Sequence, residues 1–173
     1  MPSIAGGHYL FFTPHGRGIY QYEMNSLNYR PLLRALLVAM DRWVTLGDEP
    51  PPSAYPRIND GTLVDFARWQ ESFPRIPDVR LPESLYAPLR LDFGPRWETL
   101  GIADLVPPKV GPAFRTLVPA VDADGNELAG IRLPEIAVPL ATYVGWNLRG
   151  AECGAEGMLA RWVGSQWPFA RSP

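Results

Sequence analysis

Apolar residues recur at helical spacing between Arg30 and Leu46. They are Leu32, Leu33, Leu36, Leu37, Met40, Trp43 and Val44. Spacings of three and four residues place them on one face of an amphipathic helix. Asn28 can cap this helix, Pro31 suits its first turn, and Gly47 suits the left-handed residue that commonly follows a helix. We expect the stripe to be a core face, because such residues are mostly buried in globular proteins.

A second apolar pattern, Tyr9 to Phe12, is short enough for a strand and leads directly into the sequence TPHG at residues 13–16. His15 would then lie just beyond the end of a strand and ahead of the helix. A strand that carries Leu10 and Phe12 could form an ordinary layer with the leucine stripe. The N-terminal third therefore predicts a strand, a histidine loop and a helix.

Prolines dominate the next segment and break its periodicity. Pro50 to Pro52 and Pro56 favour extended chain, since each fixes its own φ and biases the residue before it. A short helical or turn piece is expected at Leu63 to Ser72, after an Asn-Asp-Gly turn signal. Most of the chain from Pro50 to Pro112 is expected to be irregular, and so long a loop favours a surface that packs on a partner.

The pattern changes again between Thr116 and Leu133, where apolar runs flank the polar sequence DADGNE at residues 122–127. This is typical of a β-hairpin with a tight turn. The alternative is a calcium loop, but an EF-hand needs glycine at its sixth position and glutamate at its twelfth, where this chain has Glu127 and Leu133. We therefore assign Asp122 and Asp124 to the turn. Period-two alternation from Ile136 to Val144 predicts a further strand.

Composition narrows the class of protein. The chain has 173 residues, 46% of them hydrophobic and 20% charged, with a net charge of −2. This length suits one unit, residues 1–173, built from residues 1–48 and an extension at 49–173. The composition predicts a soluble protein, and the charge offers no patch for nucleic acid or an anionic membrane. Cys153 is the only cysteine, so we expect no disulfide, and we predict no metal and no cofactor.

The first residues, MPSIAGG, lack the basic start and apolar stretch of a secretory signal, so no targeting segment is expected and the compartment stays open. Met1 could also be the start of a fragment whose parent extends upstream.

Several stretches together resemble the C-terminal part of the large bacterial α/β-hydrolase-domain proteins, a mostly uncharacterised family. The resemblance runs from about Tyr9 to Arg171. It is carried by RPLLRALLV at 30–38, PPPS at 50–53, DGTLV at 60–64, LDFGP at 91–95, VDADGNE at 121–127, GIRLPE at 130–135 and ATYVGWNLR at 141–149. The resemblance implies an α+β segment: the C-terminal strand and helix of an α/β-hydrolase-like layer, followed by a proline-rich extension with a hairpin.

The same resemblance implies that His15 is the general-base histidine of a serine hydrolase. Such a base needs a serine hydroxyl within hydrogen-bond reach and a carboxylate on its other nitrogen. The chain departs from the family here, because none of its serines lies in the G-x-S-x-G turn. A solvated turn histidine is the alternative for His15. Arg17 could bind a substrate carboxylate through its planar fork, although an arginine between glycines is more often a solvated charge.

The sequence therefore predicts the C-terminal segment of an esterase-type hydrolase that acts on a small ester if an upstream part supplies the serine. It predicts either that partner or self-association, and no nucleic-acid or membrane partner. The first alternative is a non-catalytic binding or assembly module derived from the family. A weak stand-alone hydrolase that pairs His15 with a local carboxylate is the third. The tryptophans could line an apolar substrate pocket, but large aromatics chiefly supply core area.

Overall fold

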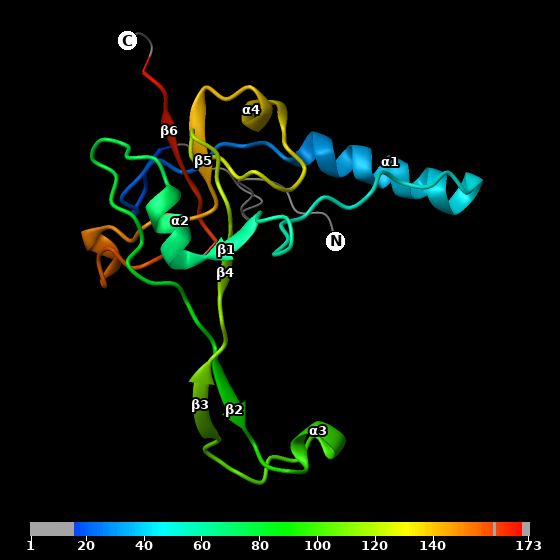
Figure 1. Cartoon of the computed structure of the whole chain (residues 1–173), viewed down its shortest axis with the longest axis vertical. Helices are drawn as coiled ribbons and strands as arrows, with labels where there is room; N and C mark the ends of the chain where they lie inside the picture. The colour runs from blue at the N-terminus through cyan, green and yellow to red at the C-terminus, as the bar shows by residue number, and fades with distance from the viewer. Residues whose placement is uncertain (1–15, 161, 171–173) are drawn as a thin grey trace. The chain divides into compact units, whose positions relative to one another are not determined.

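The structure is a computed structural model that describes residues 16–160 and 162–170. The predicted strand at Tyr9 to Phe12 and His15 therefore lie outside the described residues. The chain divides into two compact parts, which are described separately below. The main part holds residues 1–84 and 118–173, and the second part holds residues 85–117. Figure 1 gives the order of the elements along the chain.

The main part contains small paired strands rather than one large sheet. Strand β1 (Leu63–Asp65) pairs with β4 (Leu117–Pro119), and β5 (Ala141–Val144) pairs antiparallel with β6 (Ser165–Pro168). Helix α2 (Phe66–Ser72) follows β1 without a loop. A one-turn helix α4 (Pro134–Ala137) precedes β5, and a 3-10 turn η1 spans Ala151–Cys153.

Two groups of buried side chains form the core of this part. The first contains Leu27, Leu133 and Ile136. The second lies between α2 and the strands, and its members are Val64, Trp69, Phe73 and Val144, with Trp146 and Trp167 packed against them. Its aromatic rings contact one another mostly edge-on or tilted, the geometry that their quadrupoles favour.

Helix α1 has the predicted bounds, Arg30–Leu46. Asn28 Oδ1 accepts a hydrogen bond from the Arg30 N–H at 3.2 Å, although the N-cap position itself is Tyr29. Gly47 adopts φ 77°, and its N–H donates to the carbonyl of Trp43 at 3.1 Å. Both ends of the helix are therefore confirmed.

The prediction that the leucine stripe is a core face is wrong. No residue of α1 is buried, and Leu37 and Val44 keep 62% and 78% of their surface exposed. The reason is that no sheet of the described residues covers this face; Leu32, in the first turn, packs against the first core group. Periodicity reports that a face is apolar, but it does not report what covers it.

The proline-rich segment is mostly irregular, as predicted, but it is interrupted by short elements. The turn at 122–127 is present, with one antiparallel bridge between Val121 and Glu127 in place of a longer hairpin ladder. The predicted strand at Ile136 to Val144 is correct only for β5, because its first residues belong to α4. The mixed α+β character agrees with the prediction. The strand of the predicted hydrolase-like layer lies outside the described residues, and the helix of that layer is α1.

The second part is an antiparallel pair of β2 (Leu89–Asp92) and β3 (Lys109–Ala113), with the short helix α3 (Trp97–Leu100) between them in sequence. All four β2 residues are exposed. Phe93 and Trp97 contact each other with ring centres 4.6 Å apart, and Arg96 forms an ion pair with Asp104.

No helix of the described residues is long and apolar enough to cross a membrane.

Candidate functional site

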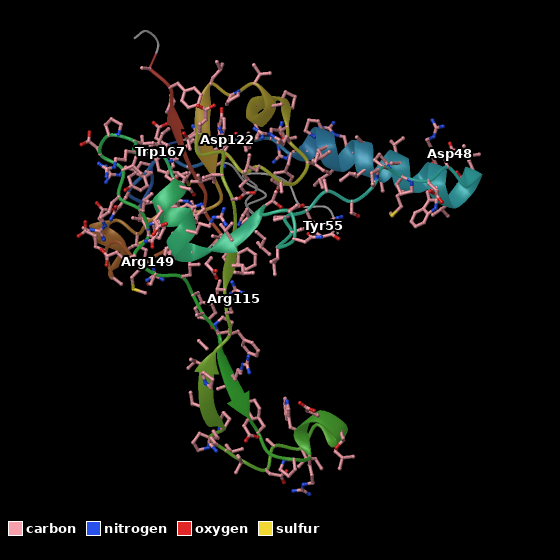
Figure 2. The ribbon with its side chains drawn as sticks, in the orientation of Figure 1. Asp48, Tyr55, Arg115, Asp122, Arg149 and Trp167 are labelled. Carbon is pink, nitrogen blue, oxygen red and sulfur yellow. The ribbon has the colours of Figure 1, made fainter. Side chains whose placement is uncertain are left out.

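A groove of about 480 Å³ opens on the main part. Residues 17–22 and residues 77–80 meet there with Glu156 and Trp167 from the C-terminal region. The lining residues are Arg17, Gln21, Tyr22, Pro77, Asp78, Val79, Arg80, Glu156 and Trp167. Its size lies within the range of small-molecule sites in proteins. Trp167, on β6, is labelled in Figure 2.

Hydrogen bonds hold the first wall in place. The Gln21 N–H donates to the carbonyl of Leu148 at 2.9 Å, and Gln21 Nε2 donates to the carbonyl of Arg149 at 3.1 Å. Asn147, which is fully buried, accepts from the Tyr22 N–H at 3.3 Å and donates to the Tyr22 carbonyl at 3.1 Å. Residues 21 and 22 are therefore fixed from both sides.

Tyr22 joins this wall to the second one. Its hydroxyl accepts a hydrogen bond from the Arg80 N–H at 2.7 Å and lies 3.1 Å from the Arg80 carbonyl, to which it donates. Its ring meets Trp167 edge-on, with centres 5.1 Å apart, and Trp167 in turn contacts Trp146 at 5.4 Å. The half-buried rings of Tyr22 and Trp167 thus give the groove an ordered aromatic wall.

Charged side chains surround that wall, and all four are exposed: Arg17, Asp78, Arg80 and Glu156. Arg17 Nε donates to the carbonyl of Tyr20 at 2.7 Å, and no carboxylate of the described residues lies within ion-pair distance of Arg17. Arg80 has a loose ion pair with Glu83, 3.6 Å between Nη2 and Oε1. Because both partners are well exposed, that pair contributes little to stability.

Gly157 lets the Arg80 guanidinium approach the chain. A Cβ at this position would lie 2.9 Å from Arg80 Cζ and still closer to its Nη2. Gly157 also has φ 79°, which non-glycine residues rarely adopt. The position of the Arg80 head group therefore depends on the absence of a side chain at residue 157.

Of the two predicted site residues, the structure describes one. Arg17 lines the groove, whereas His15 lies outside the described residues. No sequence signal identified Tyr22, Arg80 and Trp167 as members of one site, because they come from three distant segments.

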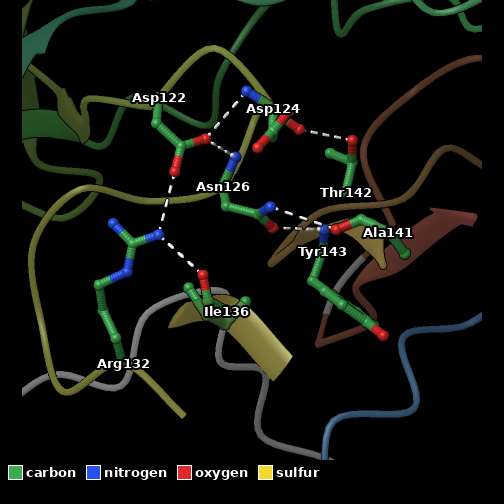
Figure 3. Close-up of polar contacts among 8 residues, drawn as sticks. All are labelled: Asp122, Asp124, Asn126, Arg132, Ile136, Ala141, Thr142 and Tyr143. Carbon is green, nitrogen blue, oxygen red and sulfur yellow. Dashed lines mark hydrogen bonds and ion pairs between the residues drawn. The ribbon is translucent and has the colours of Figure 1, made fainter. Parts of the chain in front are cut away.

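Asp122 and Asp124, which the sequence assigned to a turn rather than to a calcium loop, belong to a polar network in that turn (Figure 3). One carboxylate oxygen of Asp122 accepts from the N–H groups of Asp124 and Asn126, and the other accepts from Arg132 at 3.0 Å. The side chain of Asn126 bridges to β5. This network holds a turn, and within residues 16–160 and 162–170 no group of three or more His, Cys, Asp or Glu side chains is placed to hold a metal.

Three serine hydroxyls of the described chain are engaged in structural hydrogen bonds. Ser165 is fully buried and donates to the carbonyl of Trp146 at 2.6 Å, and Ser72 donates to the carbonyl of Trp69. Ser26 donates to Gln166 Oε1 at 2.7 Å.

Three described groups have clearly shifted pKa values, and none of them lines the groove. Hydrogen bonds from Thr62 lower the pKa of Asp60, and the hydrogen bond from Arg96 lowers that of Asp104. Burial raises the pKa of Tyr143. The described groove residues offer charged and aromatic side chains for binding a ligand.

The family of the chain follows from comparison with known proteins. A family model described as "Alpha/beta hydrolase domain" matches residues 13–173. No curated protein and no solved structure matches the chain significantly. Because the matched region covers almost the whole chain, including the TPHG sequence and every residue of the groove, this protein belongs to the α/β-hydrolase-domain family.

Proposed function

We propose that this chain is the C-terminal segment of an esterase-type serine hydrolase, and that it supplies His15 as the general base. The nucleophilic serine comes from an upstream part, because no serine of this chain lies in a G-x-S-x-G turn. The substrate is a small carboxylic ester. The groove beside Arg17 forms one wall of the substrate site.

In this mechanism, the external serine attacks the ester carbonyl while His15 accepts its proton. His15 then returns the proton to the leaving alkoxide, which departs as the alcohol and leaves an acyl-enzyme. In the second half, His15 takes a proton from water, and the resulting hydroxide attacks the acyl carbonyl. His15 then returns this proton to the serine oxygen as its bond to the acyl group breaks, so the carboxylic acid is released and the serine is regenerated.

The uncovered face of α1 is the single observation that carries the proposal. Helix α1 exposes Leu37, Met40 and Val44, each more than half accessible. It has no acidic residue in its first turn and no basic residue in its last, so charges do not reinforce it. A helix of this length draws most of its stability from packing of its apolar face. A hydrolase sheet on an upstream part is a partner of the right chemistry for that face.

The position of Arg17 supports the placement of the substrate. His15 precedes it by two residues, and two residues of chain span at most about 7 Å. A base at His15 would therefore act close to whatever ligand Arg17 holds.

The test is hydrolysis of p-nitrophenyl acetate by the chain alone and by the chain produced together with its upstream coding region. We expect turnover only when the upstream part is present. His15→Ala should reduce that turnover at least a hundredfold, since a general base contributes about that much or more. His8→Ala is the matched control, because it removes the only other histidine and should leave the rate unchanged.

Two results would contradict the proposal. Turnover by the chain alone that disappears in His15→Ala would show a stand-alone hydrolase. Equal rates for His15→Ala and the unaltered protein in the presence of the upstream part would remove the general-base role.

The second candidate is a non-catalytic binding or assembly module. Its specific support is that three serine hydroxyls of the described chain, those of Ser26, Ser72 and Ser165, are already engaged as donors to amide-type oxygens. An upstream region without G-x-S-x-G, together with a complex that binds but does not hydrolyse esters, would favour this module.

A further inference from the structure

We propose that the groove recognises a flat aromatic compound with a free carboxylate, and that Arg17 binds the carboxylate while the ring lies against Tyr22 and Trp167. The identification of this compound as the substrate's acyl part rests on the proposed function. Binding of the compound in the groove does not rest on the proposed function, because all the residues that make the contacts lie within residues 16–160 and 162–170. The inferred substrate is then an aromatic ester that carries a second, unesterified carboxylate.

The aromatic wall selects the body of the ligand. Trp167 and Tyr22 are held in fixed orientations by their edge-on contact and by the bonds of Tyr22 to Arg80. Pro77 and Val79 add apolar surface to the same groove. Aromatic rings prefer offset or edge-on contact with other rings, so a planar ligand gains more here than a flexible alkyl chain of equal size.

Arg17 selects the head group. Its Nε is used by the carbonyl of Tyr20, which orients the guanidinium and leaves the four N–H groups of its two terminal nitrogens. No described carboxylate lies within ion-pair distance of this guanidinium. A planar guanidinium with two parallel N–H groups matches a carboxylate in two-point geometry, and such bonds are about twice as strong as neutral ones.

The other charges limit the ligand's charge. Asp78 and Glu156 line the same groove as Arg17 and Arg80, so the four side chains sum to zero. A monoanion can pair with one arginine, whereas a doubly charged phosphate group is opposed by both carboxylates. The groove should therefore prefer a carboxylate to a phosphate monoester of the same ring.

The test is binding of phenylacetate, as the probe, to the full chain. Binding is measured by the quenching of tryptophan fluorescence and by the broadening of the NMR lines of phenylacetate. Benzyl alcohol has a comparable ring without the charge, and phenyl phosphate has the ring with a doubly charged group. We expect phenylacetate to bind most tightly. Arg17→Gln should weaken it about tenfold, the worth of one charge-assisted interaction near 1.4 kcal/mol.

Arg75→Gln is the matched control, because Arg75 is an exposed arginine of the main part that does not line the groove. It should leave binding unchanged, and neither variant should alter the melting temperature. Equal affinities for phenylacetate and benzyl alcohol, or equal losses in the two variants, would overturn the inference. No step of this experiment uses turnover or His15, so it can succeed where the hydrolase proposal fails and can fail where that proposal succeeds.

Discussion

At the residue scale, buried asparagines connect distant backbone segments, a role that the hydrophobic pattern of the sequence does not reveal. Asn25, Asn126 and Asn147 are each at most 1% exposed. Their amides bond backbone groups of segments far away in sequence: Asn25 reaches Val144, and Asn147 reaches Tyr22. An amide carries both donors and an acceptor, so it can satisfy an irregular backbone that has no ladder partner. These residues replace the missing sheet bonds of a chain with little regular structure.

Asn126→Ala tests this role. The side chain accepts from the Tyr143 N–H at 2.8 Å and donates to the Ala141 carbonyl at 3.2 Å, so alanine leaves both groups without a partner. We expect a loss of about 2 to 3 kcal/mol in the free energy of unfolding, measured by urea denaturation. Asp124→Ala, on the exposed side of the same turn, should change it by less than about 0.5 kcal/mol. Similar losses in both variants would count against the buried amide as the cause.

Glycines at positive φ provide a second test at this scale. Gly125 has φ 79°, and a Cβ there would lie 2.8 Å from Thr142 Cγ2 and 3.2 Å from Phe73 Cζ. Gly61 has φ 75° with nothing within 4 Å. Gly61→Ala should therefore lower the free energy of unfolding by about 1 kcal/mol, through the strain of a left-handed backbone alone. Gly125→Ala should lower it by roughly 2 kcal/mol more, because the added Cβ also overlaps its neighbours. Thermal unfolding of the two variants measures both losses of stability. Equal losses would mean that the turn at Gly125 can shift to accept a Cβ without a loss of stability.

At the scale of elements, the second part depends on a polar pair rather than on a core. Every residue of β2 is exposed, and Arg96 and Asp104 link the chain on either side of α3. The Arg96 guanidinium lowers the pKa of Asp104. A carboxyl whose pKa is lower when folded stabilises the folded form above its unfolded pKa. That stabilisation disappears as the pH falls through the lowered value.

We therefore expect the residues around α3 to lose order selectively in acid, below the ordinary aspartate pKa of about 3.9. Carbon-detected NMR titration of the Asp104 carboxyl gives its pKa directly. Arg96→Gln should raise that pKa towards the ordinary value, while Arg90→Gln, on β2, should not. An Asp104 titration that is unaffected by Arg96→Gln would exclude the pair as the cause of the shift.

At the scale of the whole molecule, a stripe of exposed apolar side chains on α1 is the feature with the widest consequences. Apolar patches of this kind mark interfaces or lead to aggregation. The exposed members of the stripe contribute little to the stability of the isolated chain, since their side chains remain in contact with water. It should instead govern how the chain associates.

The double variant Leu37→Gln and Val44→Gln separates these roles. At low protein concentration its unfolding free energy should stay within about 1 kcal/mol of the unaltered chain, because glutamine suits a helix and both sites are exposed. Light scattering should show less self-association, and binding to an upstream hydrolase part should weaken. Ile136→Ala is the contrast: Ile136 has no exposed surface, and its truncation should cost about 2 to 5 kcal/mol. A double variant as unstable as Ile136→Ala would show that the stripe is buried within the monomer.

Local chemistry determined the features that the sequence predicted correctly. Pro31 and Gly47 mark the ends of α1 because each restricts or frees its own backbone, and the Asp-x-Asp-Gly-Asn turn closes through bonds within five residues. The family also followed from local motifs, because the resemblance needed no knowledge of how the segments pack.

The tertiary structure alone decided which surfaces are covered and which side chains meet. The sequence marks the α1 face as apolar, but burial depends on whether another element lies against it. Beyond the first turn, where Leu32 packs against the first core group, most of the face stays exposed. Likewise Arg17, Tyr22, Arg80 and Trp167 form one groove only because the Asn147 amide and the Tyr22 hydroxyl bind distant backbone segments together. Periodicity encodes a residue's relation to its neighbours in sequence, whereas a site depends on long-range contacts that no local pattern specifies.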